Sequence, residues 1–350
     1  MKRFSSLIGG ILLAALGAMG AQNADTVGAG SQLGPTKYIP DFHGTFRAVY
    51  EMSTVNGDSR FMVRNARLSV GGFVLPKIDY YLQVDFSDRG KITLLDAYLR
   101  ITPEKALKLM AGQMRVPFSV SASRAPHKYY FINRPFIGKY AGNLRSVGVK
   151  AGYTVPGTSL YVEGGAFNAT SRSDHSTWNK ELTYGIKANI KLPGGFTPEV
   201  GFMSRQYGDN ATGARFNQFD ASLNWMWDRW TVEAEYLMAN CTANFPTSHQ
   251  YSVFVNYDLP VGRGIVDILA FAARFDGHSD ASNGYYNADH VLTVSYPERK
   301  RITVGATTRY QRGKVHFDMR LNYEQYFYRN HRDADPSEDN KLAAAMILYF

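Results

Sequence analysis

Apolar and polar residues alternate along almost the whole chain, and this period of two constrains the fold more than any other feature. The alternation is clearest at residues 182–192, and it recurs at 219–228 and 315–324. Successive side chains of a β-strand point to opposite faces, so each of these segments predicts a strand with one apolar and one polar face. We therefore expect an all-β protein.

The apolar surface of these strands could face a second sheet or a membrane. The chain contains 23 Tyr and 21 Phe, yet no long apolar run follows residue 21. A transmembrane helix needs about 20 apolar residues, so the sequence predicts none in that part of the chain. Two alternatives remain: a large soluble all-β protein, or a membrane barrel whose apolar surface comes from every second residue.

The lengths of the connections favour the barrel. Short connectors at 75–77, 156–158, 193–195, 228–229 and 312–313 alternate with longer polar ones at 170–179, 208–215, 242–248, 276–299 and 329–340. Transmembrane barrels have short periplasmic turns and longer external loops, so we expect an antiparallel transmembrane β-barrel of about 16 strands. Residues 287–296 could be an additional strand or part of a long loop.

The expected strands are residues 42–53, 60–74, 78–87, 93–102, 106–115, 144–154, 159–169, 181–192, 196–206, 216–227, 230–240, 249–259, 264–275, 301–310, 314–327 and 341–350.

The two ends of the chain indicate export to the outer membrane. Lys2 and Arg3 precede an apolar run at 7–16 and then small residues, as in a secretory signal peptide cleaved after Gly20, Ala21 or Ala24. We predict a signal peptide at 1–21, a short periplasmic segment at 22–40 and the barrel at 41–350. Residues 344–350 form an amphipathic strand that ends on Phe350, which resembles the C-terminal signal of bacterial outer-membrane barrels.

No known enzymatic motif stands out in the sequence. The single cysteine, Cys241, cannot form an intramolecular disulfide, and the eight histidines lack zinc-type spacing. We find no nucleophile elbow, phosphate-cradling glycine loop or Cys-x-x-Cys pair. We therefore expect no metal, no cofactor and no catalytic site, with an outer-membrane hydrolase as a remote alternative.

The most informative charged segment follows the fifth expected strand. From 105 to 162 the sequence contains no Asp or Glu but nine Lys and Arg residues, as many as the formal net charge of +9. The middle of this segment, 116–142, is rich in proline and aromatic residues, and by strand order it is the third external loop. We expect it to fold into the lumen, where a basic constriction would attract anions. The candidate constriction residues are Arg115, Arg124, Lys128, Arg134, Lys139 and Arg145.

A simpler interpretation of this segment is a basic external loop that contacts acidic lipopolysaccharide or solvent. Its aromatic content argues against that interpretation, because solvent-facing loops seldom contain so many rings.

Several short motifs resemble the phosphate-selective porin O and P family. They are residues 112–119 (Gly-Gln-Met-Arg-Val-Pro-Phe-Ser), 131–134 (Phe-Ile-Asn-Arg), 145–149 (Arg-Ser-Val-Gly-Val) and 64–68 (Arg-Asn-Ala-Arg-Leu) followed by two glycines at 71 and 72. The resemblance implies a 16-stranded trimeric barrel whose third loop enters the pore and whose Arg and Lys residues bind anions such as phosphate. Arg115, Arg134 and Arg145 fall within matching motifs. Arg124, Lys128 and Lys139 are candidates only because they lie in the same acid-free loop.

The strand parity predicts a lumen wall of mixed charge. The basic residues expected inside are Arg47, Arg67, Arg100, Lys108, Lys150, Lys187, Lys191, Arg309 and Arg320. The acidic residues expected inside are Asp79, Asp85, Asp96, Glu163, Asp220, Glu233, Glu235 and Asp318.

Three functions therefore stay open at this point. The first is an anion-preferring porin for passive diffusion of small solutes, the second a general porin with little selectivity, and the third a structural or adhesive barrel without an open pore. The expected partners are small anions such as phosphate, outer-membrane lipid and lipopolysaccharide, and two further copies of the chain in a homotrimer. An exported chain seldom meets nucleic acid, so we expect no such partner.

Overall fold

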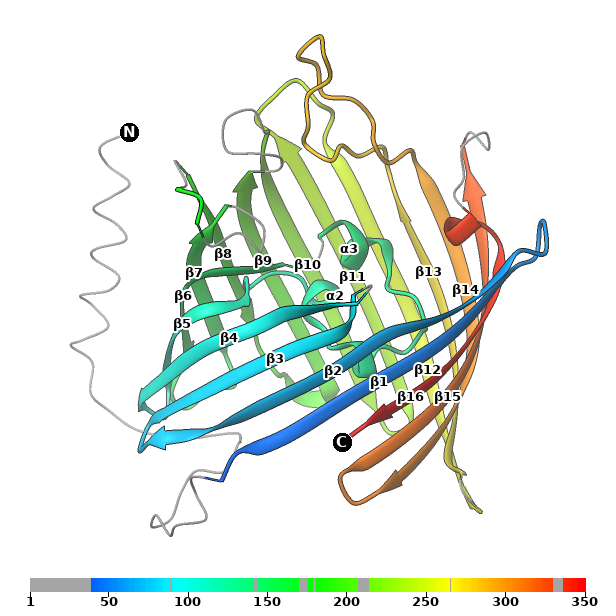
Figure 1. Cartoon of the computed structure of the whole chain (residues 1–350), viewed down its shortest axis with the longest axis horizontal. Helices are drawn as coiled ribbons and strands as arrows, with labels where there is room; N and C mark the ends of the chain where they lie inside the picture. The colour runs from blue at the N-terminus through cyan, green and yellow to red at the C-terminus, as the bar shows by residue number, and fades with distance from the viewer. Residues whose placement is uncertain are drawn as a thin grey trace.

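The protein is a single closed antiparallel β-barrel of 16 strands (Figure 1). The computed structural model describes residues 39–88, 90–141, 144–169, 176–178, 181–206, 214–264, 266–329 and 336–350. Each strand pairs with its neighbours in the sequence, and β1 pairs with β16 to close the ring. The predicted fold class and strand number are confirmed.

The strands are β1 (Asp41–Ser53), β2 (Ser59–Leu75), β3 (Ile78–Asp88), β4 (Lys91–Glu104), β5 (Leu107–Arg115), β6 (Arg145–Thr154), β7 (Tyr161–Asn168), β8 (Leu182–Asn189), β9 (Phe196–Gln206), β10 (Arg215–Trp227), β11 (Trp230–Cys241), β12 (Ser248–Arg263), β13 (Val266–His278), β14 (Arg299–Arg312), β15 (Val315–Tyr328) and β16 (Lys341–Tyr349). The short helices are α2 (Val120–Ser123), η2 (Pro126–Lys128), α3 (Phe136–Tyr140), η3 (Pro193–Gly195) and η5 (Pro336–Glu338).

The period of two places polar side chains on the inner face and apolar side chains on the outer face. On β15, Arg320 and Glu324 are buried while Leu321 is 50% exposed. On β10, Asp220 is buried while Phe219 is 54% exposed. A soluble sandwich would bury the apolar side chains, so this inverted pattern supports a barrel with a lipid-facing exterior.

The seam of the barrel is closed by the last residue of the chain. The backbone amides of Gly44 and Phe350 donate to each other's carbonyl oxygens at 3.2 Å. A Cβ atom at position 44 would lie 2.4 Å from the Phe350 ring, so a larger residue there would displace this terminal aromatic side chain. The C-terminal strand therefore pairs on both of its edges, with β15 and with β1.

The connections differ in length on the two ends of the barrel. Two residues join β10 to β11 and β14 to β15, whereas the β13–β14 connection covers 279–298. Residues 287–296 belong to that long loop, which contains two isolated bridges, Ala281 to Tyr296 and Tyr286 to Leu292, and no additional barrel strand.

Several strand ends differ from the sequence prediction, such as that of β12, which continues to Arg263 instead of ending at 259, and two of the differences change the lumen wall. β8 stops at Asn189, so Lys191 lies beyond the strand and is exposed rather than part of the wall. The apolar alternation continues past the end of β8, but there Leu192 forms only an isolated bridge with Phe196 across the η3 turn. β13 continues to His278, since Asp276 and His278 point inward and are buried, although their sequence suggested a loop.

The predicted signal peptide and most of the predicted periplasmic segment fall in residues 1–38, outside the part of the chain that the structure describes. Among the described residues, no helix combines the length and the apolar character needed to cross a membrane.

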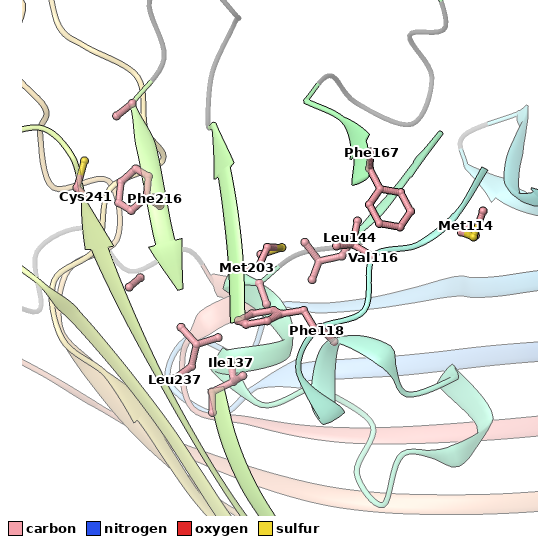
Figure 2. Packing of buried hydrophobic residues seen from close by; sticks show 14 of the residues in the cluster. Met114, Val116, Phe118, Ile137, Leu144, Phe167, Met203, Phe216, Leu237 and Cys241 are labelled. Carbon is pink, nitrogen blue, oxygen red and sulfur yellow. The ribbon is translucent and has the colours of Figure 1, made fainter. Parts of the chain in front are cut away.

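The connection between β5 and β6 contains α2, η2 and α3, and we call residues 116–141 the β5–β6 segment. In Figure 1 its two α-helices lie between the front strands β1–β4 and the back strands β10–β12. Phe118 and Ile137 of this segment are buried against Met203 of β9 and Leu237 of β11 (Figure 2). The segment therefore packs on the inner face of the wall through an apolar cluster.

A glycine in the wall makes room for this contact. A Cβ atom at Gly185 on β8 would lie 2.6 Å from Val116 Cγ1 and 3.0 Å from the Pro117 carbonyl oxygen. Real Cβ atoms essentially never approach as closely as 2.6 Å, so a larger residue at this position would displace the segment or the strand.

Candidate anion-binding site

Polar contacts with the wall hold the far end of the β5–β6 segment. Asn322 of β15 accepts a hydrogen bond from the backbone N–H of Ile132 at 2.7 Å, and Asp276 of β13 accepts one from Phe136 N–H at 2.9 Å. Arg274, also on β13, donates to the Asn133 carbonyl oxygen at 2.9 Å. These contacts with inward-facing side chains support the expectation that the third external loop folds into the lumen.

Arginines converge on one hollow beside this segment. The hollow is a narrow depression that is partly open to solvent and encloses no water-sized cavity. Its lining residues are Arg67, Arg115, Ala122, Arg124, Pro126, Tyr129, Arg134 and Arg145. Four of the six candidate constriction residues therefore lie together, joined by Arg67 of β2.

Three of these arginines are matched by carboxylates. Arg67 lies 2.8 Å from Asp85, and Arg145 lies 2.9 Å from Asp96. Arg124 lies 2.5 Å from Glu233.

Arg115 and Arg134 have no carboxylate oxygen within 4 Å among the described residues. Arg115 Nη1 donates to the carbonyl oxygens of Ala122 at 3.0 Å and Arg124 at 3.3 Å. Arg134 lies 5.9 Å from the centre of the Tyr129 ring. Carbonyl groups and a ring face orient a guanidinium without cancelling its charge. These two arginines leave the hollow with a net positive charge.

Arg47 adds a third uncompensated guanidinium near the same ring. Its guanidinium carbon lies 5.9 Å from the centre of the Tyr129 ring, the same distance as that of Arg134. Its Nη2 donates to the Ile132 carbonyl oxygen at 2.8 Å. Its other partner is the amide oxygen of Asn65 at 3.1 Å. Arg47 is buried, so this charge is fixed in place by neutral oxygens.

The other two candidate constriction residues lie outside the hollow. Lys128 is exposed and has no ion pair among the residues that the structure describes. Lys139 forms an ion pair with Glu338 of the β15–β16 loop, which also pairs with Arg299. Lys139 therefore contributes less uncompensated charge than the sequence suggested.

The acidic residues of the wall are mostly neutralised. Six of the eight that parity placed inside form ion pairs: Asp79 with Arg100, Asp85 with Arg67, Asp96 with Arg145, Glu163 with Lys150, Glu233 with Arg124, and Asp318 with Arg320. The remaining two, Asp220 and Glu235, are at most 4% exposed. The wall is mixed in composition, but its acids expose little negative charge.

The predicted lumen-lining bases take part in the same pairing. Arg67, Arg100, Lys150 and Arg320 each pair with an acid named above, and Lys187 lies 3.4 Å from Glu199 and 3.7 Å from Glu163. Arg309 pairs with Asp258 at 2.7 Å, whereas Arg47, Lys108 and Lys191 have no carboxylate partner in the described part of the chain. Pairing therefore leaves uncompensated charge on β1, on β5 and on the β5–β6 segment.

Three ionisable groups of the segment have shifted pKa values, and one of them is Tyr140, whose pKa burial raises to about 12. Burial, followed by repulsion from Lys128, lowers the pKa of His127 to about 4, so this imidazole is neutral at pH 7. Burial opposes the charge of Arg124, but Glu233 outweighs it and raises the pKa of that guanidinium. Histidine protonation therefore does not supply the positive charge of the hollow near neutral pH.

Sequence reasoning missed several residues that build the site. Ser119 and Ser121 bind Glu235, more than 100 positions away, and Tyr129 lies between Arg47 and Arg134. Ser119 precedes a short helix and caps it by accepting from Ala122 N–H, which is a local signal. The contact with Glu235 has no such signal, because it depends on how the barrel closes. Within the described ranges, no group of three or more His, Cys, Asp or Glu side chains could hold a metal ion.

Solved outer-membrane proteins share this fold. An anion-selective porin from Comamonas acidovorans is 9% identical, with a TM-score of 0.62 over 89% of this chain and 98% of that one. OmpF of Salmonella typhi, in complex with daunomycin, is 13% identical, with a TM-score of 0.59 over 91% of this chain and 99% of that one. The trimer form of OmpT of Vibrio cholerae is 12% identical, with a TM-score of 0.59 over 89% and 99%.

The structural similarity establishes the fold, but sequence identities this low leave the identity of the solute open. A search of curated protein sequences found no significant match. The sequence itself matches the model of the family "phosphate-selective porin O and P" over residues 40–257, more than half of the chain. Together with the closed 16-stranded barrel, this match shows that the chain is an outer-membrane porin and belongs to the phosphate-selective porin O and P family.

Proposed function

We propose that this porin lets small anions, phosphate among them, diffuse passively across the outer membrane. The observation that carries the proposal is the hollow of five arginines, in which Arg115 and Arg134 have no carboxylate partner among the described residues. A fixed positive charge inside a narrow, low-dielectric passage attracts anions and repels cations. No covalent step is needed for this function.

The neutralised wall supports anion preference over a general, unselective pore. If the acids of the wall were unpaired, they would oppose the arginines and favour cations. Their pairing with Arg and Lys leaves Arg47, Lys108, Arg115, Lys128 and Arg134 among the groups that set the field. The relative titled as an anion-selective porin, although only 9% identical, adds weak support.

The remaining features of the proposal follow from the sequence and the relatives. Residues 1–21 act as the export signal, and 22–40 form a short periplasmic segment. The apolar outer face contacts lipid and lipopolysaccharide. Three copies assemble, as in the trimer form of the Vibrio cholerae protein.

Planar-bilayer recording tests the proposal. Purified protein in a potassium chloride gradient should form channels whose reversal potential lies toward that of chloride, and phosphate should also carry current. A reversal potential toward potassium would contradict the anion preference. Folded protein that never conducts would instead favour a structural or adhesive barrel.

A further inference from the structure

Glu235 on β11 is a buried acid that is bound by the β5–β6 segment. Ser119 Oγ donates to Glu235 Oε1 at 2.6 Å, and the backbone N–H of Ser121 lies 3.2 and 3.3 Å from the two carboxylate oxygens. The hydroxyl of Ser121 also donates to Oε2. Glu235 is 4% exposed, and no Lys or Arg nitrogen lies within 4 Å of it in the described residues. Its carboxylate is therefore held by donors of α2 and of its N-cap, with Asp220 of β10 as a further hydrogen-bonding neighbour on the wall.

That element, α2, also positions the arginines. Arg115 donates to the carbonyl oxygen of Ala122, which lies within α2, and to that of Arg124, which directly follows it. A helix of four residues has little stability of its own, so α2 keeps its position through contacts with its surroundings. Displacing α2 would remove both carbonyl partners of Arg115.

Two acids of β11 support α2 on the wall: Glu235 binds Ser119 and Ser121, and Glu233 pairs with Arg124, the residue that directly follows the helix. On the other side, α3 packs so closely that a Cβ atom at Gly138 would lie 3.2 Å from the Ser121 carbonyl oxygen. Ser119 adopts a positive φ of 49°, a conformation that is costly for a serine and persists only where its surroundings hold it. The hydrogen bond from Ser119 to Glu235 supplies such a constraint.

We infer that Glu235 is a positioning residue that increases the anion preference of the pore, although it is itself an acid. It holds the N-terminal end of α2 against the wall, and α2 with its C-cap supplies the carbonyl oxygens that hold Arg115 at the hollow, whereas Arg124 is held by Glu233. This inference rests on the proposed anion preference, and it names the residue that holds the arginine in the position that the preference requires.

The sign of one substitution separates positioning from simple electrostatics. If Glu235 acted only through its charge, its removal would make the lumen more positive and raise the preference for anions. If Glu235 acts by positioning α2, Glu235→Ala should lower the chloride-to-potassium permeability ratio by about twofold or more, because Arg115 is released from the hollow.

The matched control is Glu163→Gln. Glu163 is also an inward acid, but it pairs with Lys150 at 3.0 Å, and among the described residues no hydrogen bond or ion pair joins it to the β5–β6 segment. Its removal should raise the permeability ratio by exposing Lys150. Opposite directions for Glu163→Gln and Glu235→Ala support positioning, and an increase in both variants overturns it.

Two further variants keep the test independent of folding and of charge. Glu235→Gln keeps one carbonyl acceptor for the serines, so it should retain most of the wild-type ratio. Ser119→Ala with Ser121→Ala changes no charge and should lower the ratio as Glu235→Ala does. Only variants with the normal heat-modifiable mobility of a folded barrel are compared.

Bilayer recording in a potassium chloride gradient supplies the readout for all variants. A serine double variant that folds and keeps the wild-type ratio would overturn the inference. A wild-type channel without anion preference would overturn the proposed function itself, so the two failures are distinguishable.

Discussion

Individual arginines of this barrel fall into two groups that look alike in the sequence. Arg145 and Arg115 lie opposite each other in the β5–β6 register, and both line the hollow. The Arg145 side chain is 1% exposed and contacts both oxygens of Asp96 at 2.9 Å, whereas Arg115 binds backbone carbonyl oxygens. One arginine therefore stabilises the wall, and the other provides uncompensated charge.

This difference predicts opposite effects on stability and selectivity. Arg145→Gln leaves the buried Asp96 without its ion partner, so it should lower the free energy of unfolding by about 3 kcal/mol. Arg115→Gln strands no carboxylate and should cost about 1 kcal/mol or less, while reducing anion preference. Urea unfolding in detergent, followed by tryptophan fluorescence, measures the first effect.

A control for this prediction is the double variant Asp96→Asn with Arg145→Gln. It removes the stranded carboxylate and should recover most of the lost stability. Equal destabilisation by Arg115→Gln and Arg145→Gln would contradict the division into two groups.

At the scale of elements, the strands were predictable because their signal is local. Alternation fixes which side chains of β10 and β15 face outward, and short polar turns fix most strand ends. The predicted strand ends were wrong where the sequence pattern and the backbone hydrogen bonding differ. The apolar alternation runs past the end of β8. β13 extends through polar residues, among them Asp276, which binds the β5–β6 segment.

The candidate site was less predictable for a physical reason. The acid-free composition of 105–162 located the basic segment, but the pairing of each arginine depends on partners on distant strands. The ion pair of Arg124 with Glu233 joins residues 109 positions apart, and that of Lys139 with Glu338 joins the segment to another loop. No local pattern reports such contacts, because they form only when the barrel has closed.

Packing of the β5–β6 segment against β8 gives a prediction at this scale. Gly185→Val should push Val116 and Pro117 away from the wall and further into the lumen, so the displaced segment should narrow the pore and lower single-channel conductance. The control is Gly164→Val on β7, where the nearest atom to an added Cβ lies 3.4 Å away, an ordinary contact. Unchanged conductance in folded Gly185→Val would show that the segment does not narrow the channel.

For the whole molecule, the field of the lumen depends on which charges remain unpaired rather than on the formal balance of +9. Most inward acids and bases cancel within the wall, so they add stability and little selectivity. The uncompensated cations include Arg47 of β1, Lys108 and Arg115 of β5, and Lys128 and Arg134 of the β5–β6 segment. The charge that acts on a permeating ion is therefore concentrated near these residues. Because several of them are partly buried, salt screens their charge less than it screens exposed charge.

The most direct test compares the reversal potential of the wild type with that of a variant carrying Arg115→Gln, Lys128→Gln and Arg134→Gln, in the same potassium chloride gradient at low ionic strength. We predict that the wild-type potential lies toward chloride and that the triple variant shifts toward potassium. Equal reversal potentials for the two folded proteins would contradict the claim that these unpaired cations set the selectivity of the pore.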